Sequence, residues 1–136
     1  MAGQFELSLI EFGREAGDRA DEAIREVVLE CFSRVIARST PVVDTGRFRA
    51  NWQYGLGAVP AGLISDGGTT EAPAAPAQPV ALAPGTGWGN VHYIVNNVPY
   101  ARPLEYGHSA KGSAMVRTTI ADFAGIVDGA AARVNR

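Results

Sequence analysis

The chain has 136 residues, of which 46% are hydrophobic and 19% are charged, and its net charge at neutral pH is −2. This length suits a single domain, residues 1–136, with a hydrophobic core of its own. The charge balance argues against a basic surface for sequence-specific nucleic-acid binding. No apolar run approaches the roughly 20 residues of a membrane span, and no secretory signal is visible, so we expect a soluble protein made in a reducing cytosol.

Residues 14–39 predict a long amphipathic helix, because apolar residues recur there at steps of three and four. Pro41 disfavours helical geometry at Thr40, so the helix should end near Ser39. Cys31, the only cysteine, falls on the apolar face and is predicted to be a small core residue. The apolar face comprises Ala16, Ala20, Ile24, Val27, Cys31 and Val35, and the acid-before-base pairs of the outer face are Glu15–Arg19, Asp21–Arg25 and Glu30–Arg34.

The middle of the chain predicts two strands separated by a long loop. A short turn leads into a strand over residues 51–57, and the β-branched and aromatic run at 88–98 predicts a second strand. The segment between them, residues 58–87, holds five of the eight prolines and few large apolar residues. Because such a composition cannot offset the entropy lost on ordering, we expect residues 58–87 to form a long flexible loop.

After the second strand, residues 99–112 predict a short helical turn and a polar loop. Residues 113–134 then predict a C-terminal helix with Ser113 as its N-cap. The expected fold class is therefore α+β, with a long N-terminal and a C-terminal helix packed on a small, mostly antiparallel sheet. The apolar face of the C-terminal helix should comprise Val116, Ile120, Phe123, Val127, Ala130 and Val134.

The tripeptide Asp44-Thr45-Gly46 raises the hypothesis of a retroviral-type aspartic protease. Such a site needs two carboxylates that share one proton, which two copies of Asp44 could supply in a dimer. However, the adjacent Arg47 would hold Asp44 ionised, and a helix precedes the tripeptide where the protease has strands. We therefore favour a structural role for this tripeptide over a catalytic one.

In the structural interpretation, Asp44 caps a short helical turn by accepting from the backbone N–H groups of Gly46 or Arg47. Gly46 permits the tight turn, because glycine adopts conformations that strain other residues. Phe48 and Trp52, four residues apart, would then anchor the turn in the core.

No other pattern predicts an enzyme. The two histidines, His92 and His108, and Cys31 do not have the spacing of a metal site. The glycine-rich residues 85–90 precede a strand and so do not form a phosphate-binding loop. Glu105 lies near His108, but without a nucleophile or a second acid the pair indicates a hydrogen-bonded turn. We predict no catalytic residue, no cofactor and no metal.

Two segments, "TPVVDTGRFRANW" at 40–52 and "NNVPYARPLEYGHS" at 96–109, resemble a family of small phage neck proteins. These are the tail-completion or head–tail joining proteins of long-tailed phages. Members of this family have the first motif after a long helix and the second before a terminal helix. Val43 is an extra residue relative to the family's pattern, and the segment after Gly107 lacks the usual prolines. The matching residues are Pro41, Asp44, Thr45, Gly46, Arg47, Phe48, Arg49 and Trp52 in the first segment, and Asn97, Tyr100, Ala101, Glu105, Tyr106 and Gly107 in the second.

The resemblance implies a non-enzymatic virion protein, made in the host cytoplasm and located in the neck or at the tail end. It would complete or cap the tail tube, or join the tail to the head connector, as a ring for which six subunits are favoured. The implied partners are further copies, a tail-tube or tail-terminator protein, and a connector or stopper protein. Completion, terminator and stopper roles remain open, as does a binding or assembly module of a mobile element that never enters the virion. The residues expected at subunit interfaces are Arg47, Arg49, Arg102 and His108.

Overall fold

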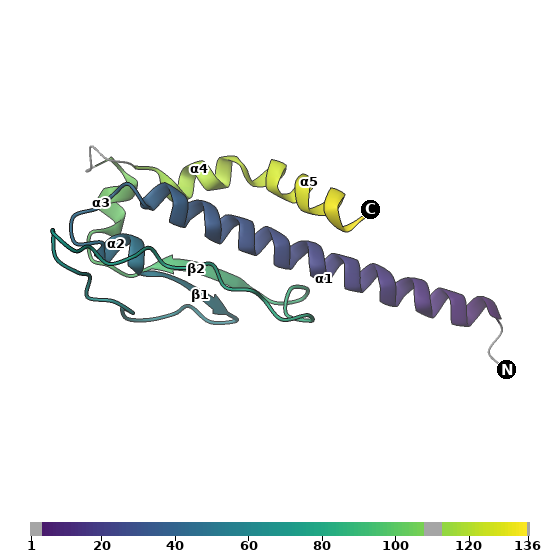
Figure 1. Ribbon diagram of the computed structural model, residues 1–136. Helices are drawn as coiled ribbons and strands as arrows, with labels where there is room; N and C mark the ends of the chain where they lie inside the picture. The colour runs from purple at the N-terminus through teal and green to yellow at the C-terminus, as the bar shows by residue number, and fades with distance from the viewer. Residues whose placement is uncertain (1–3, 108–112, 136) are drawn as a thin grey trace.

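The computed structural model describes residues 4–107 and 113–135, and its backbone is dominated by helix α1 (Gln4–Ser39) (Figure 1). The end of α1 at Ser39 agrees with the prediction, whereas its start lies ten residues before the predicted position 14. Gly13 lies inside this extension, but a glycine costs only about 1 kcal/mol in a helix interior. The good helix formers around it therefore carry α1 through this position. At 36 residues, α1 is about 54 Å long.

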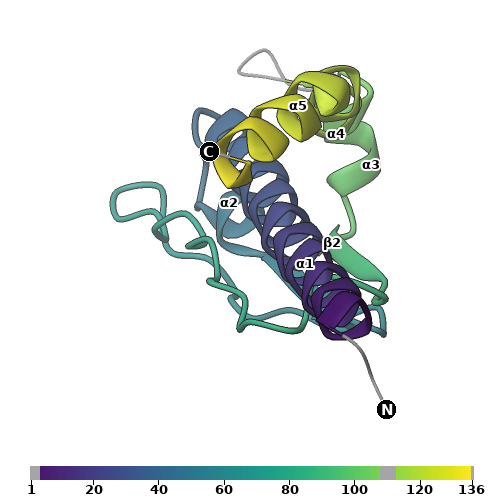
Figure 2. The ribbon, with the colours of Figure 1, turned by 90° about the vertical axis from the view of Figure 1, so that its right-hand side faces the viewer.

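A two-stranded antiparallel sheet lies against the second half of α1 (Figures 1 and 2). It consists of β1 (Trp52–Leu56) and β2 (His92–Asn96), paired from Trp52 opposite Asn96 to Leu56 opposite His92. Both strands lie inside the predicted ranges 51–57 and 88–98. The side chains of Trp52, Tyr54 and Ile94 alternate onto the face that meets the core, as the two-residue period of a strand requires.

The opposite face of the sheet is covered by the start of the long segment 58–87. Gln53 donates its side-chain amide to the carbonyl oxygen of Gly62 at 2.8 Å, and Asn97 donates to the same oxygen at 3.0 Å. A Cβ atom on Gly55 would lie 2.2 Å from the carbonyl oxygen of Ala58, so only glycine allows this close approach. The segment contains no helix or strand, and its first residues, up to Gly62, pack on this face of the sheet.

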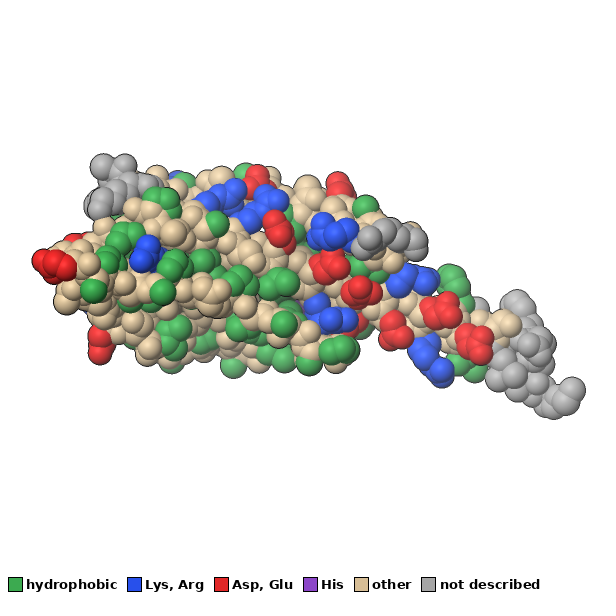
Figure 3. Space-filling view, in the orientation of Figure 1, with side chains coloured by type: hydrophobic (Ala, Val, Ile, Leu, Met, Phe, Trp, Pro, Cys, Tyr) green, Lys and Arg blue, Asp and Glu red, His purple; other side chains and the backbone are tan. Residues whose placement is uncertain are grey.

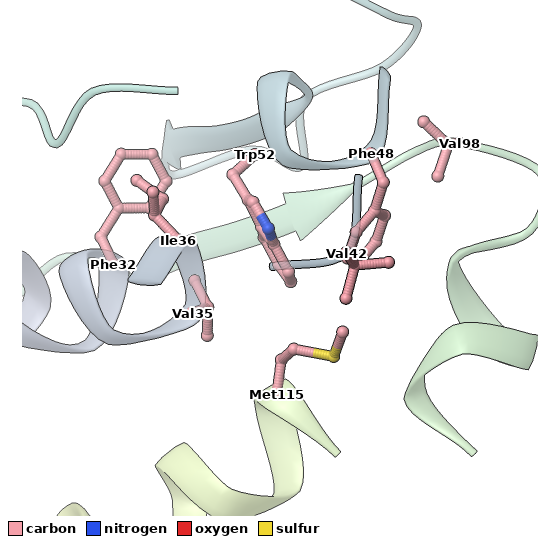
Figure 4. Packing of buried hydrophobic residues seen from close by; sticks show 8 residues of the cluster. All are labelled: Phe32, Val35, Ile36, Val42, Phe48, Trp52, Val98 and Met115. Carbon is pink, nitrogen blue, oxygen red and sulfur yellow. The ribbon is translucent and has the colours of Figure 1, made fainter. Parts of the chain in front are cut away.

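The hydrophobic core lies where α1 ends and the sheet begins (Figure 4). Phe48 and Trp52 meet edge to face there, with ring centroids 5.7 Å apart. The indole N–H of Trp52 donates to the hydroxyl of Ser39 at 2.8 Å, which satisfies its one polar group inside the core. The cluster comprises Phe32, Val35, Ile36, Val42, Phe48, Trp52, Val98 and Met115.

Three further helices follow the sheet. They are α3 (Ala101–Glu105), α4 (Met115–Ala121) and α5 (Phe123–Val134), and the last two run along α1 on the side away from the long segment (Figures 1 and 2). The prediction of one continuous helix over 113–134 is wrong, because the helical hydrogen bonding is interrupted by a tighter turn at Asp122. Its N–H group is shared between the carbonyl oxygens of Thr118 and Thr119, each at 3.1 Å. Ser113 is not the N-cap; Ala114, with φ 55°, occupies that position.

The buried face of α4 and α5 also differs from the predicted one. Met115, Thr119 and Ile126 face inwards. Of the predicted apolar face only Ala130 is buried, whereas four of its residues are exposed: Val116, Ile120, Phe123 and Val127. Both faces are apolar, so hydrophobicity alone does not choose between them. The observed choice places Asp122 beside the guanidinium groups of α1 and lets small residues approach α1 closely. The ion pairs join Asp122 to Arg34 at 3.0 Å and to Arg38 at 2.5 Å.

Candidate functional site

The first motif segment forms the junction between α1 and the sheet. The short helix α2 (Arg47–Ala50) has Gly46 at its N-cap position. Gly46 has φ 76° and therefore lies in the left-handed region. A Cβ atom on Gly46 would lie 2.3 Å from the carbonyl oxygen of Ala74. The carbonyl oxygen of Thr45 accepts from the N–H groups of Gly68 at 2.7 Å and Ala74 at 2.9 Å. The junction therefore holds the middle of the long segment through its backbone.

The prediction that Asp44 caps this turn is wrong. Helix α2 has no side-chain cap, and the N-cap position belongs to Gly46. Asp44 is exposed and lies two residues before the cap, too early for its carboxylate to receive the N–H groups of the first turn. The tight turn depends on the conformation of Gly46 and not on a hydrogen bond from Asp44.

Buried Asn51, at the end of the same segment, was not singled out from the sequence. It is 0% exposed, and its amide nitrogen donates to the carbonyl oxygens of Arg47 at 2.6 Å and Ser65 at 2.8 Å. Its amide oxygen accepts from the N–H groups of Ile64 at 2.8 Å and Ser65 at 3.1 Å. Asn51 thus uses both ends of its amide to bind the long segment.

The arginines predicted at interfaces have different environments. Arg49 donates to the carbonyl oxygens of Ala74 at 2.8 Å and Thr40 at 3.4 Å, so it stabilises the fold. Arg47 is half-buried, and within the described part of the chain its Nε has no hydrogen-bond partner. Arg102 is exposed on α3, and His108 lies outside the described residues. Arg47 and Arg102 therefore remain candidates for subunit contacts.

The second motif segment joins α3 to α4. The carboxylate of Glu105 accepts from the N–H groups of Val116 at 2.9 Å and Arg117 at 3.0 Å, and it pairs with the Arg117 guanidinium at 3.1 Å. Burial opposes ionisation of this carboxyl, but these N–H groups and the guanidinium outweigh it and lower the pKa of Glu105. Glu105 therefore caps the first turn of α4.

The other matched residues of this segment lie around that cap. Tyr106 receives the Arg117 cation over its ring, 4.6 Å from the centroid. Tyr100 stands at the N-cap of α3, and Gly107 has φ 97°, which favours glycine. Like the first motif, the second builds a junction between elements.

Asp21 ties the end of the long segment to α1. It is 8% exposed, and its carboxylate accepts from the N–H groups of Gly85 at 2.9 Å, Gly87 at 2.7 Å and Trp88 at 3.0 Å. It also keeps the predicted pair with Arg25 at 2.9 Å. The N–H groups, with that of Trp88 foremost, hold the pKa of Asp21 far below its ordinary value. The sequence indicated only a surface ion pair here.

Replacing Asp21 with asparagine is expected to lower the melting temperature at pH 7 by several degrees, because the new NH₂ group would face backbone donors. Asp18→Asn, at an exposed position one turn earlier, is the matched control and should change little. Since folding lowers the pKa of Asp21 far below its ordinary value, its contribution is complete above about pH 5, starts to decrease as the pH falls below about 4, and is lost fully only near the lowered pKa. Thermal melts from pH 7 to pH 3 should therefore show the two proteins converging in acid. A constant difference would contradict this role.

An apolar groove of about 550 Å³ separates β2 from α5, and α1 forms the wall between them. Ile24, Val27 and Cys31 line it from α1, with Ile94 opposite Phe123 and Val127. Cys31 is therefore half-buried in the groove wall, whereas the sequence predicted a core position for it. Burial raises the pKa of its thiol.

The groove continues into an apolar stripe along α4 and α5. Val116, Ile120, Phe123 and Val127 recur at steps of four, three and four, which places them along one side of the two helices. All four are exposed, Ile120 by 66% and Phe123 by 50%. This stripe is the apolar face that the sequence predicted to be buried. An exposed apolar surface of this kind is typical of a site that binds another protein.

Comparison with protein-family models, with curated proteins and with solved structures finds no match to this chain. Among residues 4–107 and 113–135, no group of three or more His, Cys, Asp or Glu residues could hold a metal ion. Over the same residues, no helix has the length and hydrophobicity needed to cross a membrane. The groove and the stripe are thus the surface on which a functional argument rests.

Proposed function

We propose that this protein is a structural component of the neck of a long-tailed phage. It completes or caps the tail tube and helps to join the tail to the head connector, as a ring in which six subunits are favoured. Its partners are further copies of itself, the tail-tube or terminator protein, and the connector or stopper protein. It acts in the virion after assembly in the host cytoplasm.

The main support for this proposal is that the residues of the two motif segments hold the fold together, while a separate apolar surface is left exposed. The two motif segments on which the resemblance rests hold elements together through Gly46 and Glu105. The surface left over is the apolar groove with its stripe, which suits association with proteins. An α+β subunit with such a surface fits a closed ring of head-to-tail contacts.

Quantitative mass spectrometry of purified particles tests the proposal. The protein should be present in a small fixed number per virion, with six copies favoured, and electron microscopy should place it at the neck. Inactivating its gene should leave filled heads and separate tails in the lysate. If the protein is abundant in the lysate but absent from purified particles, it is instead an assembly or binding module that never enters the virion.

A further inference from the structure

The N-terminal part of α1, residues 4–20, projects beyond the rest of the molecule (Figure 1). We call this part the arm. Its described side chains, at residue 8 and over residues 10–20, are exposed or half-buried, and Asp21 is the first of the described side chains to be buried. A Cβ atom placed on Gly13 or Gly17 would meet no other atom within 4 Å. The arm thus lies outside the body of its own subunit.

The arm is poorly stabilised by its own subunit. Helices shorter than about 12–15 residues are marginal in water without tertiary contacts, and the arm is little longer than that. It also exposes large apolar side chains, Ile10 by 58% and Phe12 by 63%. Both acidic and basic side chains lie on the face of the arm that Figure 3 shows. A partner that covers the apolar residues would explain both its sequence and its helical form.

The apolar positions of the arm continue the series that lines the groove. In the sequence, apolar residues stand at positions 5, 9, 12, 16 and 20, at steps of three and four, and the series then reaches Ile24, Val27 and Cys31. One face of α1 is therefore apolar from end to end. In one subunit Ile24, Val27 and Cys31 of this face line the groove, and Phe12 in the arm is exposed.

The arm and the receiving surface also agree in size. The arm is about 25 Å long, and the stripe from Val116 to Val127 with the adjoining groove extends about 20 Å. One side of such a helix offers roughly 400–500 Å², over half of the 800 Å² per partner of a stable contact. In a ring each subunit would give one arm and receive one, so every subunit would bury this area twice.

We infer that the groove and stripe of one subunit bind the arm of a second copy of this chain. The arm cannot reach the groove of its own subunit, because both belong to one continuous helix that points away from the body (Figure 1). The contact is heterologous, with an arm on one side and a groove on the other, and such contacts produce rings or open chains instead of symmetric dimers. It is a helix-in-groove contact that uses residues three and four apart as anchors.

This inference deepens the proposed function by naming the contact between ring subunits. Its test uses the purified protein alone, so its failure is distinct from absence of the protein from virions. Cys31 provides the probe, because it is the only cysteine and lies in the groove wall. A second cysteine in the arm, from Phe12→Cys, could not reach the Cys31 of its own chain, since 19 helical residues or about 28 Å separate them.

Phe12→Cys protein treated with diamide at pH 8.5 should give a ladder of cross-linked species from dimer upwards on a non-reducing gel. The alkaline pH is needed because burial raises the pKa of the Cys31 thiol. Sedimentation velocity of the untreated wild type should show self-association at the protein concentration used for cross-linking. Phe12→Asp should raise the dissociation constant of this self-association at least tenfold. Position 12 is exposed, so both variants should keep the wild-type helix content by circular dichroism, which shows that they fold.

Two controls distinguish cross-linking through this contact from cross-linking by random collision of subunits. Phe12→Cys with Cys31→Ser should stop at dimers, because only arm-to-arm bonds remain. Ile64→Cys, on an exposed residue of the long segment, should give no ladder beyond the dimer. A Phe12→Cys pattern that ends at dimers, or equals that of Ile64→Cys, overturns the inference. So does wild-type association that Phe12→Asp leaves unchanged.

Discussion

Replacing Gly46 with alanine should lower the free energy of unfolding by roughly 3 kcal/mol. An L residue in the left-handed region costs about 1–2 kcal/mol, and crowding a packed site adds about 1–3 kcal/mol. Both apply here, because Gly46 has φ 76° and its new Cβ would lie 2.3 Å from the carbonyl oxygen of Ala74. Urea unfolding followed by tryptophan fluorescence or circular dichroism measures the change.

Gly57→Ala is the matched control, since Gly57 has the same φ of 76° but a Cβ atom added to it would meet no other atom within 4 Å. It should cost only the conformational part, about 1–2 kcal/mol. The difference between the two variants therefore reports how closely the long segment approaches Gly46 in solution. Equal losses would mean that Ala74 does not rest on Gly46 in the free subunit. That outcome would favour the mobile loop expected from the composition of residues 58–87.

Replacing Asn51 with aspartate should destabilise the protein by roughly 4 kcal/mol at pH 7, although the two side chains have nearly the same shape. The amide nitrogen of Asn51 donates to two carbonyl oxygens, and a carboxylate oxygen in its place would face both without a proton. The site is fully buried, so the unfavourable contact is not screened by water. Chemical unfolding at pH 7 gives the magnitude.

The pH dependence of the Asn51→Asp variant separates this cause from a general loss of packing. A carboxyl group at position 51 would be neutral more readily when folded than when unfolded, so its penalty should shrink as the pH falls toward 4. Asn90→Asp is the control, because Asn90 is exposed and its amide donates to the carbonyl oxygen of Thr86 at 3.0 Å. It should change stability little. A penalty at position 51 that is independent of pH would contradict the hydrogen-bond explanation.

The α+β fold class could be predicted from the sequence, and the structure confirms it. The apolar period of α1 runs over many turns, and the strands are bounded by glycine and proline, so both signals are local. The position of Pro41 set the helix end at Ser39. The predicted start of α1 was wrong because the clearest apolar periodicity begins near residue 14, whereas the helix continues through the residues before it.

The parts that sequence reasoning missed depend on contacts between distant residues. Nothing local distinguishes Asn51 from a surface asparagine, since its partners at Ile64 and Ser65 are 13 and 14 positions away. Asp21 likewise receives N–H groups more than 60 positions along the chain. The orientation of α5 was wrong because both of its faces are apolar. Periodicity detects such a face but cannot say whether it meets the core or another subunit.

The way the long segment is held has a consequence for its tolerance of substitution. Thr45, Arg49 and Asn51 all bind backbone atoms of this segment, and none of these hydrogen bonds involves a side chain within it. Many different side chains could therefore follow the same path, provided that the glycines at close approaches are kept. Substitutions can therefore change the exposed side chains of the segment, and with them its binding partners. The hydrogen bonds of Thr45, Arg49 and Asn51 keep the fold unchanged.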